Sequence, residues 1–462
     1  MTHGYLRISL LLCGFHLALG AARGAAAPES PLWQAGAART KITPDRMIWM
    51  SGYGSRNQPA QGKLTDLWAK ALALQGPAGH RALVITLDLV GIDRGLAGTI
   101  CRQLEERLGL QRHQIAICCS HTHTGPALPH NLRVLHYLQV DKPQQQLLES
   151  YASELVKRVV AVGEEALGKL EPCQLSWGSG RATFAVNRRE NRPESAVPAG
   201  RLKGELKGPV DHDVPVLAIR NAQGALKSVL FGYACHATVL SFYQWSGDYP
   251  GFAQIELEKN HPGCVALFWA GCGADQNPLP RRTVELARHY GRRLADAVDT
   301  VLLTSQMQPV AGPLRTAYRE IDLPLAQLPS RKMLETDTMS ANRFTATRAQ
   351  MLLAQIDREG ELPASYPYPV GVWRLGTDLQ FVTLGGEVVV DFAIRLKAEL
   401  SEVRTWVAGY ANDVMAYIPS RRVLREGGYE GASAMVYYGL PSSWSEDVEK
   451  RIVDEVQHQL AP

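Results

Sequence analysis

Apolar runs alternate with amphipathic stretches along most of the chain, and this alternation predicts strands and helices in turn. Short apolar runs predict buried strands at residues 82–88, 114–119, 264–269 and 405–410, and residues 370–390 are predicted to form strands around turns at 376–378 and 385–386. Apolar residues that recur every three or four positions predict helices at 95–110, 144–170 and 283–303. Residues 214–220 and 225–234 flank the turn sequence 221–224, which indicates a β-hairpin.

Hairpins mixed with strand–helix alternation predict an α+β or mixed α/β fold. Residues 184–213 are polar and rich in turn formers, so we expect an excursion loop there. A second loop-like zone covers 324–368, with a helical pattern at 331–358. No linker is evident, and we expect one large catalytic domain over residues 28–462, with mixed sheets, helices and long loops.

The first 27 residues have the pattern of a signal peptide. Arg7 is followed by an apolar stretch at 8–19 and by small residues at 20–27, and the stretch is too short to span a bilayer. The alternative is a frayed apolar tail. We expect cleavage between Gly20 and Ala27 and a secreted or periplasmic protein, whose net charge falls from +4 to +2 because the signal holds two arginines and no acid.

Composition excludes several classes of protein. Charge is nearly balanced, and no basic stretch is long enough to indicate nucleic-acid binding. Cys13 belongs to the predicted signal peptide, which leaves seven cysteines, so at least one stays outside any internal disulfide. No CxxC spacing occurs, which argues against a cysteine zinc site. The Cys118–Cys119 pair lies in an apolar run and is predicted to be core.

Four local patterns could carry chemistry. His121 and His123, in SHTHTGP, would point to the same face of a strand and could share a metal, or they could be a solvated pair. His236 ends an apolar strand, where a core histidine is the more common outcome. Glu387 follows two glycines and either caps a helix near residue 388 or binds a metal. Tyr417 and Tyr429, twelve residues apart, say little alone.

Together these patterns resemble the neutral/alkaline non-lysosomal ceramidase family. The motifs occur in the family's order: ARTKITP (38–44), MSGY (50–53), SHTHTGP (120–126), Asn187–Arg188, GPVDHDVP (208–215), YACHAT (233–238), SGDYP (246–250), GCGADQNP (271–278), Gly386–Glu387 and YEGAS (429–433). The resemblance covers about residues 35–440 and is to the N-terminal catalytic domain, so we expect no counterpart of the family's C-terminal immunoglobulin-like domain.

The resemblance implies a zinc ion held by His121, His236, Glu387 and Tyr417. Tyr417 is assigned because the family's zinc tyrosine lies twelve residues before the tyrosine of its YE-x-AS motif, here Tyr429. His123 falls where the family places a residue that contacts substrate or handles a proton. Arg188 and Tyr429 fall at substrate-contacting positions.

The implied reaction is hydrolysis of the N-acyl amide bond of ceramide, or of a related N-acyl lipid, by zinc-activated water, giving a sphingoid base and a fatty acid. Such a substrate fits peripheral membrane contact. The loop 271–278 lacks the serine that relatives carry there, and Cys272, its one candidate nucleophile, follows an apolar run. A buried thiol is inert, so we predict direct attack by water and no acyl-enzyme.

Two other functions are open. The same fold could hydrolyse a different amide or ester, or it could be a non-catalytic binding protein. All four implied zinc ligands are present, which argues against the binding protein.

Overall fold

The computed structural model describes residues 1–2, 4, 33–304 and 307–461. The chain divides into two units, Met1–Pro31 and Leu32–Pro462, and the second holds every element discussed below. The predicted signal peptide and its boundary at residue 27 lie almost wholly outside the described residues and stay a prediction. Among the described residues, no helix is both long enough and apolar enough to cross a bilayer.

The larger of two central sheets has nine strands in the order β11-β9-β8-β6-β1-β3-β4-β5, with β13 paired to β6. Neighbours are antiparallel except β11 with β9 and β4 with β5, which are parallel. The strands are β1 (Trp33–Lys41), β3 (Trp68–Gln75), β4 (Arg81–Leu87), β5 (Ile115–Cys119), β6 (Glu171–Arg181), β8 (Asp213–Asn221), β9 (Leu226–Tyr233), β11 (Val265–Ala270) and β13 (Gln308–Pro309).

The smaller sheet has four strands in the order β14-β15-β16-β18, and only β16 and β18 run parallel. Its strands are β14 (Leu314–Pro324), β15 (Ser365–Leu375), β16 (Leu379–Leu384) and β18 (Arg404–Ala408). Three two-stranded pairs complete the β structure: β2 (Gly62–Lys63) with β10 (Gln244–Trp245), β7 (Ala185–Asn187) with β12 (Gln276–Pro278), and β17 (Glu387–Val388) with β19 (Tyr417–Ile418).

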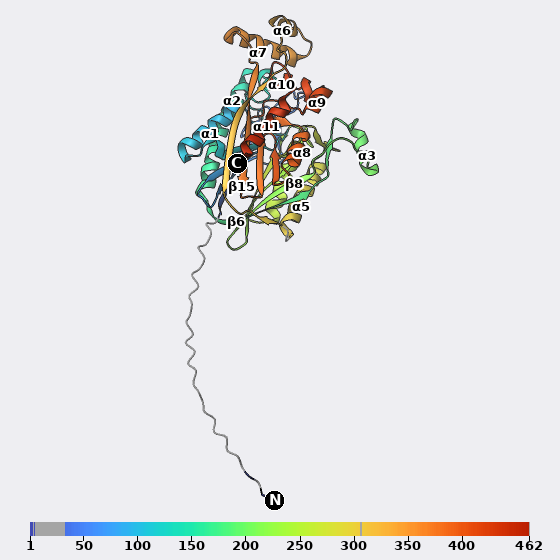
Figure 1. The fold of residues 1–462 in the computed structure, drawn as a ribbon. Helices are drawn as coiled ribbons and strands as arrows, with labels where there is room; N and C mark the ends of the chain where they lie inside the picture. The colour runs from blue at the N-terminus through green and yellow to red at the C-terminus, as the bar shows by residue number, and fades with distance from the viewer. Residues whose placement is uncertain (3, 5–32, 305–306, 462) are drawn as a thin grey trace. The chain divides into compact units, whose positions relative to one another are not determined.

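The two sheets pack against each other, and helices cover their outer faces (Figure 1). In β5, Ile117 faces the helices while Cys118 faces the smaller sheet, and in β16 Phe381 and Val382 divide in the same way. Both faces of these strands are therefore buried, which is why they are near-continuous apolar runs in the sequence. The layers are helix, sheet, sheet, helix, and the predicted mixed α/β class is correct.

Amphipathic helices supply the outer layers. Those on the larger sheet are α1 (Arg94–Leu108), α2 (Lys142–Gly168), α4 (Asp248–Asn260) and α5 (Val284–Leu303). Those on the smaller sheet are α8 (Val390–Glu399) and α11 (Val448–Leu460). The remaining helices are α3 (Val197–Lys203), α6 (Arg331–Asp337), α7 (Arg343–Glu359), α9 (Arg421–Glu426) and α10 (Met435–Tyr438).

The predicted elements are found within a few residues of their expected bounds, with two refinements. The helical pattern at 331–358 forms two helices, α6 and α7, because Ser340 to Asn342 interrupt it. The excursion at 184–213 contains β7 and α3 as well as loop.

Candidate metal centre

Four residues from distant parts of the chain meet where strands of both sheets end. His121 follows β5 and His236 follows β9 of the larger sheet, and a β-bridge between Thr122 and Ala237 joins the two loops. Glu387 begins β17 and Tyr417 begins β19, and these two residues are direct partners in that parallel pair. The fold thus gathers all four of the residues implied as metal ligands.

The expectation that His121 and His123 share the face of a strand is wrong. Strand β5 ends at Cys119, and His121 adopts a left-handed backbone with φ 59°. The loop turns back here, so the two rings still meet edge to face with centroids 4.7 Å apart. The histidines converge through loop geometry and not through strand alternation.

Backbone carbonyls fix the orientation of both implied histidine ligands. His121 Nδ1 lies 2.6 Å from the carbonyl oxygen of Val90, and His236 Nδ1 lies 2.8 Å from that of Gly273. A carbonyl only accepts, so each Nδ1 carries the hydrogen and each Nε2 presents its lone pair in the neutral ring. Those Nε2 atoms lie 3.3 and 3.2 Å from Glu387 Oε2.

This arrangement fits a cation. Burial, aided by Arg188, lowers the pKa of His236 to about 4, so its ring is neutral at pH 7. Glu387 Oε2 is buried and has no hydrogen-bond donor, and the Tyr417 hydroxyl lies 3.4 Å from His236 Nε2. Lone pairs that face one another repel unless a positive charge lies between them. The donors are imidazole, carboxylate and phenol, and this set could hold a metal ion.

His123 lies beside this centre. Its Nε2 is 3.1 Å from His121 Nε2, and one nitrogen each from His121, His123 and His236 fall within 4.8 Å of one another. Burial, followed by the two neighbouring histidines, lowers the pKa of His123 well below its usual value. Its Nδ1 is buried without a hydrogen-bond partner, and its ring packs on Tyr53 with centroids 4.9 Å apart. His123 is therefore neutral and has one nitrogen to spare.

Arg188 contacts the metal centre directly. Its Nη2 donates to the Tyr417 hydroxyl over 3.2 Å, and its guanidinium lies over the rings of Tyr417 and Tyr429. Glu430 holds it in place: Arg188 Nε donates to Oε1 over 2.8 Å, and Arg189 Nη1 donates to Oε2 over 2.7 Å. Arg188 and Tyr429 were expected at the substrate, and both line the cavity that leads to the histidines.

That cavity, the metal-site cavity, has a volume of about 770 Å³. Its walls come from MSGY, from the excursion loop, from the loops after β9 and β12, and from the YEGAS turn. The lining residues are Gly52, Tyr53, His123, Arg188, Arg192, Pro193, Glu194, His236, Thr238, Asn277, Arg281, Arg282, Tyr417, Tyr429 and Glu430.

Other sequence expectations have definite outcomes. Glu387 does not cap a helix: α8 begins at Val390, whose N–H donates to Asp275 over 3.0 Å. Cys272 is fully buried in the core of the smaller sheet, and burial raises the pKa of its thiol. All seven described cysteines are buried and free.

Two residues beside the candidate metal ligands, Tyr438 and Glu430, were not predicted from the sequence. The Tyr438 hydroxyl donates to Glu387 Oε1, and burial raises the pKa of Tyr438 well above its usual value, so the phenol stays protonated. Nothing in the local sequence marks Tyr438. Glu430 does lie in the YEGAS motif beside Tyr429, and that neighbourhood is the one signal that points to it.

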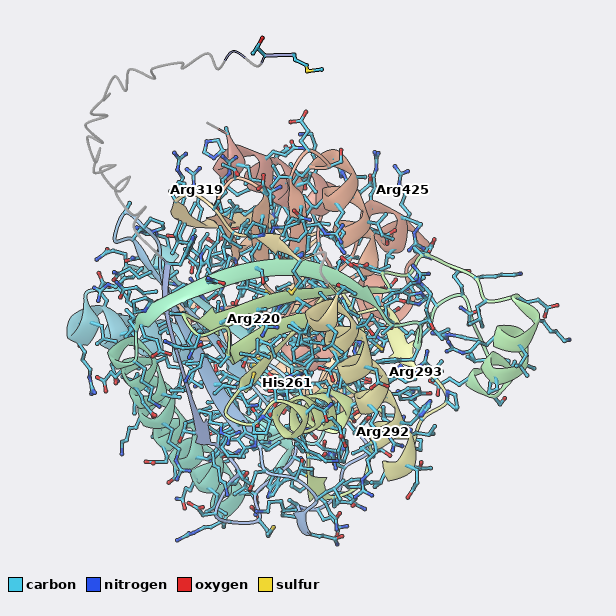
Figure 2. All side chains as sticks on the ribbon, turned by 90° about the horizontal axis from the view of Figure 1, so that it is seen from below. Arg220, His261, Arg292, Arg293, Arg319 and Arg425 are labelled. Carbon is cyan, nitrogen blue, oxygen red and sulfur yellow. The ribbon has the colours of Figure 1, made fainter. Side chains whose placement is uncertain are left out.

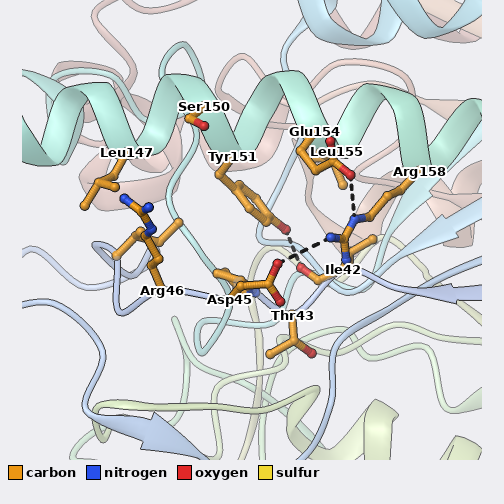
Figure 3. A pocket seen from close by; sticks show the side chains of 12 residues that line it. Ile42, Thr43, Asp45, Arg46, Leu147, Ser150, Tyr151, Glu154, Leu155 and Arg158 are labelled. Carbon is orange, nitrogen blue, oxygen red and sulfur yellow. Dashed lines mark hydrogen bonds and ion pairs between the residues drawn. The ribbon is translucent and has the colours of Figure 1, made fainter.

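A second cavity, of about 240 Å³, lies between α2 and the turn after β1 (Figure 3). Its charged groups largely satisfy one another, since Arg158 pairs with Glu154 and Asp45. The Tyr151 hydroxyl donates to the carbonyl of Ile42 over 2.7 Å. This cavity shares no lining residue with the metal-site cavity.

Fold and site define a mixed α/β protein with a buried cluster of side chains that could bind a metal, at the floor of a polar cavity. The family model for the N-terminal region of neutral/alkaline non-lysosomal ceramidases matches residues 33–268, about half of the chain. The chain belongs to this family, as its motifs predicted.

Individual relatives agree with that assignment. The neutral ceramidase of Pseudomonas aeruginosa is 23% identical over 466 aligned positions, which cover 84% of this chain and 66% of that protein, so the chain spans just under two thirds of its relative. The crystal structure of neutral ceramidase from P. aeruginosa shares the fold with a TM-score of 0.69 at 19% identity, covering 92% of this chain and 73% of that one. A ceramidase complexed with C2 has a TM-score of 0.70 at 17% identity, with coverage of 92% and 74%.

Proposed function

We propose that this protein is a zinc-dependent hydrolase of the N-acyl amide bond of ceramide or a related N-acyl lipid. One observation carries the proposal. The Nε2 atoms of His121 and His236 converge on the buried Oε2 atom of Glu387, at the floor of the metal-site cavity. Family membership supports the reaction class, because the curated relative is called a neutral ceramidase.

His121, His236, Glu387 and Tyr417 would hold the zinc. Zinc in such a site lowers the pKa of water to about 7 and polarises a carbonyl, so no covalent nucleophile is needed. The inert, buried Cys272 agrees with this route.

The chain's own groups would bind the substrate and move protons. Arg188 and Tyr429 would donate hydrogen bonds to substrate oxygens, because burial keeps the pKa of Tyr429 raised and its hydroxyl protonated. His123 is neutral and has an unpartnered Nδ1, so it would take up a proton and deliver one to the leaving amine. Asn277 lines the same wall and would orient the substrate head group.

The proposal includes export to a secreted or periplasmic location through residues 1–27, and peripheral contact with a lipid surface. The second candidate is a zinc hydrolase of the same fold with a different amide or ester substrate. The polar side chains that line the cavity are the observation that favours this second candidate.

The test is metal analysis of the purified chain from residue 28 together with hydrolysis of a fluorescent ceramide. We expect one zinc per chain, loss of hydrolysis with a chelator and recovery with zinc. A parallel screen of N-acyl lipids against soluble amides and esters separates the two candidates. A protein that binds no metal and hydrolyses none of them contradicts the proposal.

A further inference from the structure

The metal-site cavity carries more positive charge than its carboxylates balance. Four arginines and two glutamates line it. Glu430 is engaged by Arg188 and Arg189, and Glu194 is engaged by Arg281, whose Nε donates to it over 3.0 Å. Among the described residues, neither Arg192 nor Arg282 forms an ion pair with a carboxylate. Two guanidinium groups at the cavity are thus available to a ligand.

Arg282 is held over the cavity by several contacts. Its Nη1 donates to the Tyr53 hydroxyl over 3.0 Å, and its guanidinium stacks 5.2 Å from the Tyr53 ring centroid. Its backbone N–H donates to the carbonyl of Val239 over 2.7 Å. Its φ of 100° lies where glycine is unstrained and a side chain is not. Strain of this kind at a cavity wall points to a role for the side chain.

Arg192 lies on a different wall, in the excursion loop, where its Nε donates to the carbonyl of Arg188 over 3.2 Å. The bond ties Arg192 to the residue that contacts Tyr417. The ion pair between Glu194 and Arg281 joins this loop to the segment that carries Arg282. The two guanidinium groups that lack an ion pair among the described residues therefore belong to two connected segments around one opening.

The lining of the same cavity has no large aliphatic side chain, although three tyrosines supply aromatic surface. None of its lining residues is Leu, Ile, Val, Phe, Met or Trp. Sites for apolar ligands are lined mainly by aliphatic and aromatic side chains, with few polar groups, whereas six charged side chains line this cavity. A phosphate or carboxylate would find guanidinium groups of matching geometry here.

We infer that the substrate is an N-acyl compound whose amine half carries an anionic group, phosphate or carboxylate, bound by Arg192 and Arg282. In an N-acyl substrate, the acyl half is an apolar chain. We therefore assign the anionic group to the amine half of the substrate. The inference rests on the proposed hydrolysis of an N-acyl amide and narrows its substrate class.

The test compares soluble substrates that share an octanoyl chain, so that no lipid surface is present: N-octanoylethanolamine, its O-phosphate, and N-octanoyl-β-alanine. We expect kcat/KM to be at least about tenfold higher for an anionic substrate than for the neutral one, as charge-assisted hydrogen bonds predict. In the double variant R192Q/R282Q this ratio should fall by about tenfold or more. The larger ratio identifies phosphate or carboxylate as the preferred group.

The control variant is R292Q. Arg292 is an exposed arginine of α5 (Figure 2). It is absent from the cavity lining, so its loss should leave the ratio unchanged. Equal kcat/KM for neutral and anionic substrates, or equal losses for both in R192Q/R282Q, would overturn the inference.

Calorimetric binding of the same compounds to metal-free protein separates this inference from the proposed function. Preferential binding of the anionic compounds that R192Q/R282Q abolishes supports the inference even if no hydrolysis occurs. Absence of that preference overturns it whether or not the amide is cleaved.

Discussion

His123 touches the metal centre without being needed to complete it, because two histidines, a carboxylate and a phenol already converge there. We predict that His123→Ala keeps its zinc and loses most hydrolysis. Proton transfer by a positioned side chain contributes about 10²–10⁴-fold, and the fall in kcat should lie in that range. Metal content and kcat are measured on the same sample.

The matched control is His289→Ala, because His289 is exposed on α5 and does not line the metal-site cavity. It should leave both quantities unchanged. If His123→Ala loses zinc, and activity falls only in proportion, then His123 is a ligand. The trio of His121, His123 and His236 would in that case be the core of the site.

Tyr438 positions Glu387 through the hydrogen bond from its hydroxyl to Oε1, which leaves Oε2 for the metal. Tyr438→Phe removes only this bond, and we predict that zinc affinity falls about 10–100-fold, as is typical when a partner of a metal ligand is lost. Competition with a chelating dye measures the affinity. Tyr437→Phe is the control, because its hydroxyl has no hydrogen bond within the described part of the chain. Unchanged affinity in Tyr438→Phe would refute the role.

At the scale of elements, the segment after β1 supports the loop that carries His121 and His123. Gly52 has φ 97°, its N–H donates to His136 Nε2 over 2.9 Å, and a Cβ placed on it would lie 2.5 Å from the His123 ring. We predict that Gly52→Ala displaces His123. Its kcat should fall by more than the change in its free energy of unfolding can explain. Urea unfolding and kcat are compared in the same variant.

Gly79 supplies the control for that substitution. It has φ 83° in the turn between β3 and β4, and a Cβ there would meet nothing within 4 Å. Both alanines carry the left-handed backbone penalty of about 1–2 kcal/mol. Only Gly52→Ala adds the clash, so similar kcat values in the two variants would contradict the positioning role.

The elements that the sequence predicted are those buried on both faces or amphipathic at helical period, such as β4, β5, β11 and α5. Strands β1, β3, β6 and β14 were missed. The sequences of β6 and β14 are largely polar and partly exposed, whereas β3 is a mostly buried apolar run that was overlooked. The pairing of Glu387 with Tyr417 was not predictable from periodicity, since it joins two-residue strands thirty positions apart. The order of the family motifs identified Glu387 and Tyr417. Tyr438 lies in no such motif, so only the folded structure shows that it contacts Glu387.

At the scale of the whole molecule, the metal centre joins the two sheets. His121 and His236 follow strands of the larger sheet, whereas Glu387 and Tyr417 follow strands β16 and β18 of the smaller one. Without a cation, buried acceptor atoms face each other at this junction. Binding of zinc to the folded state alone should therefore stabilise the protein as a unit.

We predict that a chelator lowers the free energy of unfolding, by about 2.7 kcal/mol relative to protein with free zinc at 100 times its Kd. Urea unfolding with and without chelator measures the difference. In Glu387→Gln the difference should vanish, because the variant lacks the carboxylate between the two imidazoles. Glu320→Gln is the matched control, since Glu320 pairs with Arg94 and accepts from the Tyr318 hydroxyl at the exposed surface, and it should retain the full difference. Equal chelator effects in the two variants would place the zinc elsewhere in the molecule.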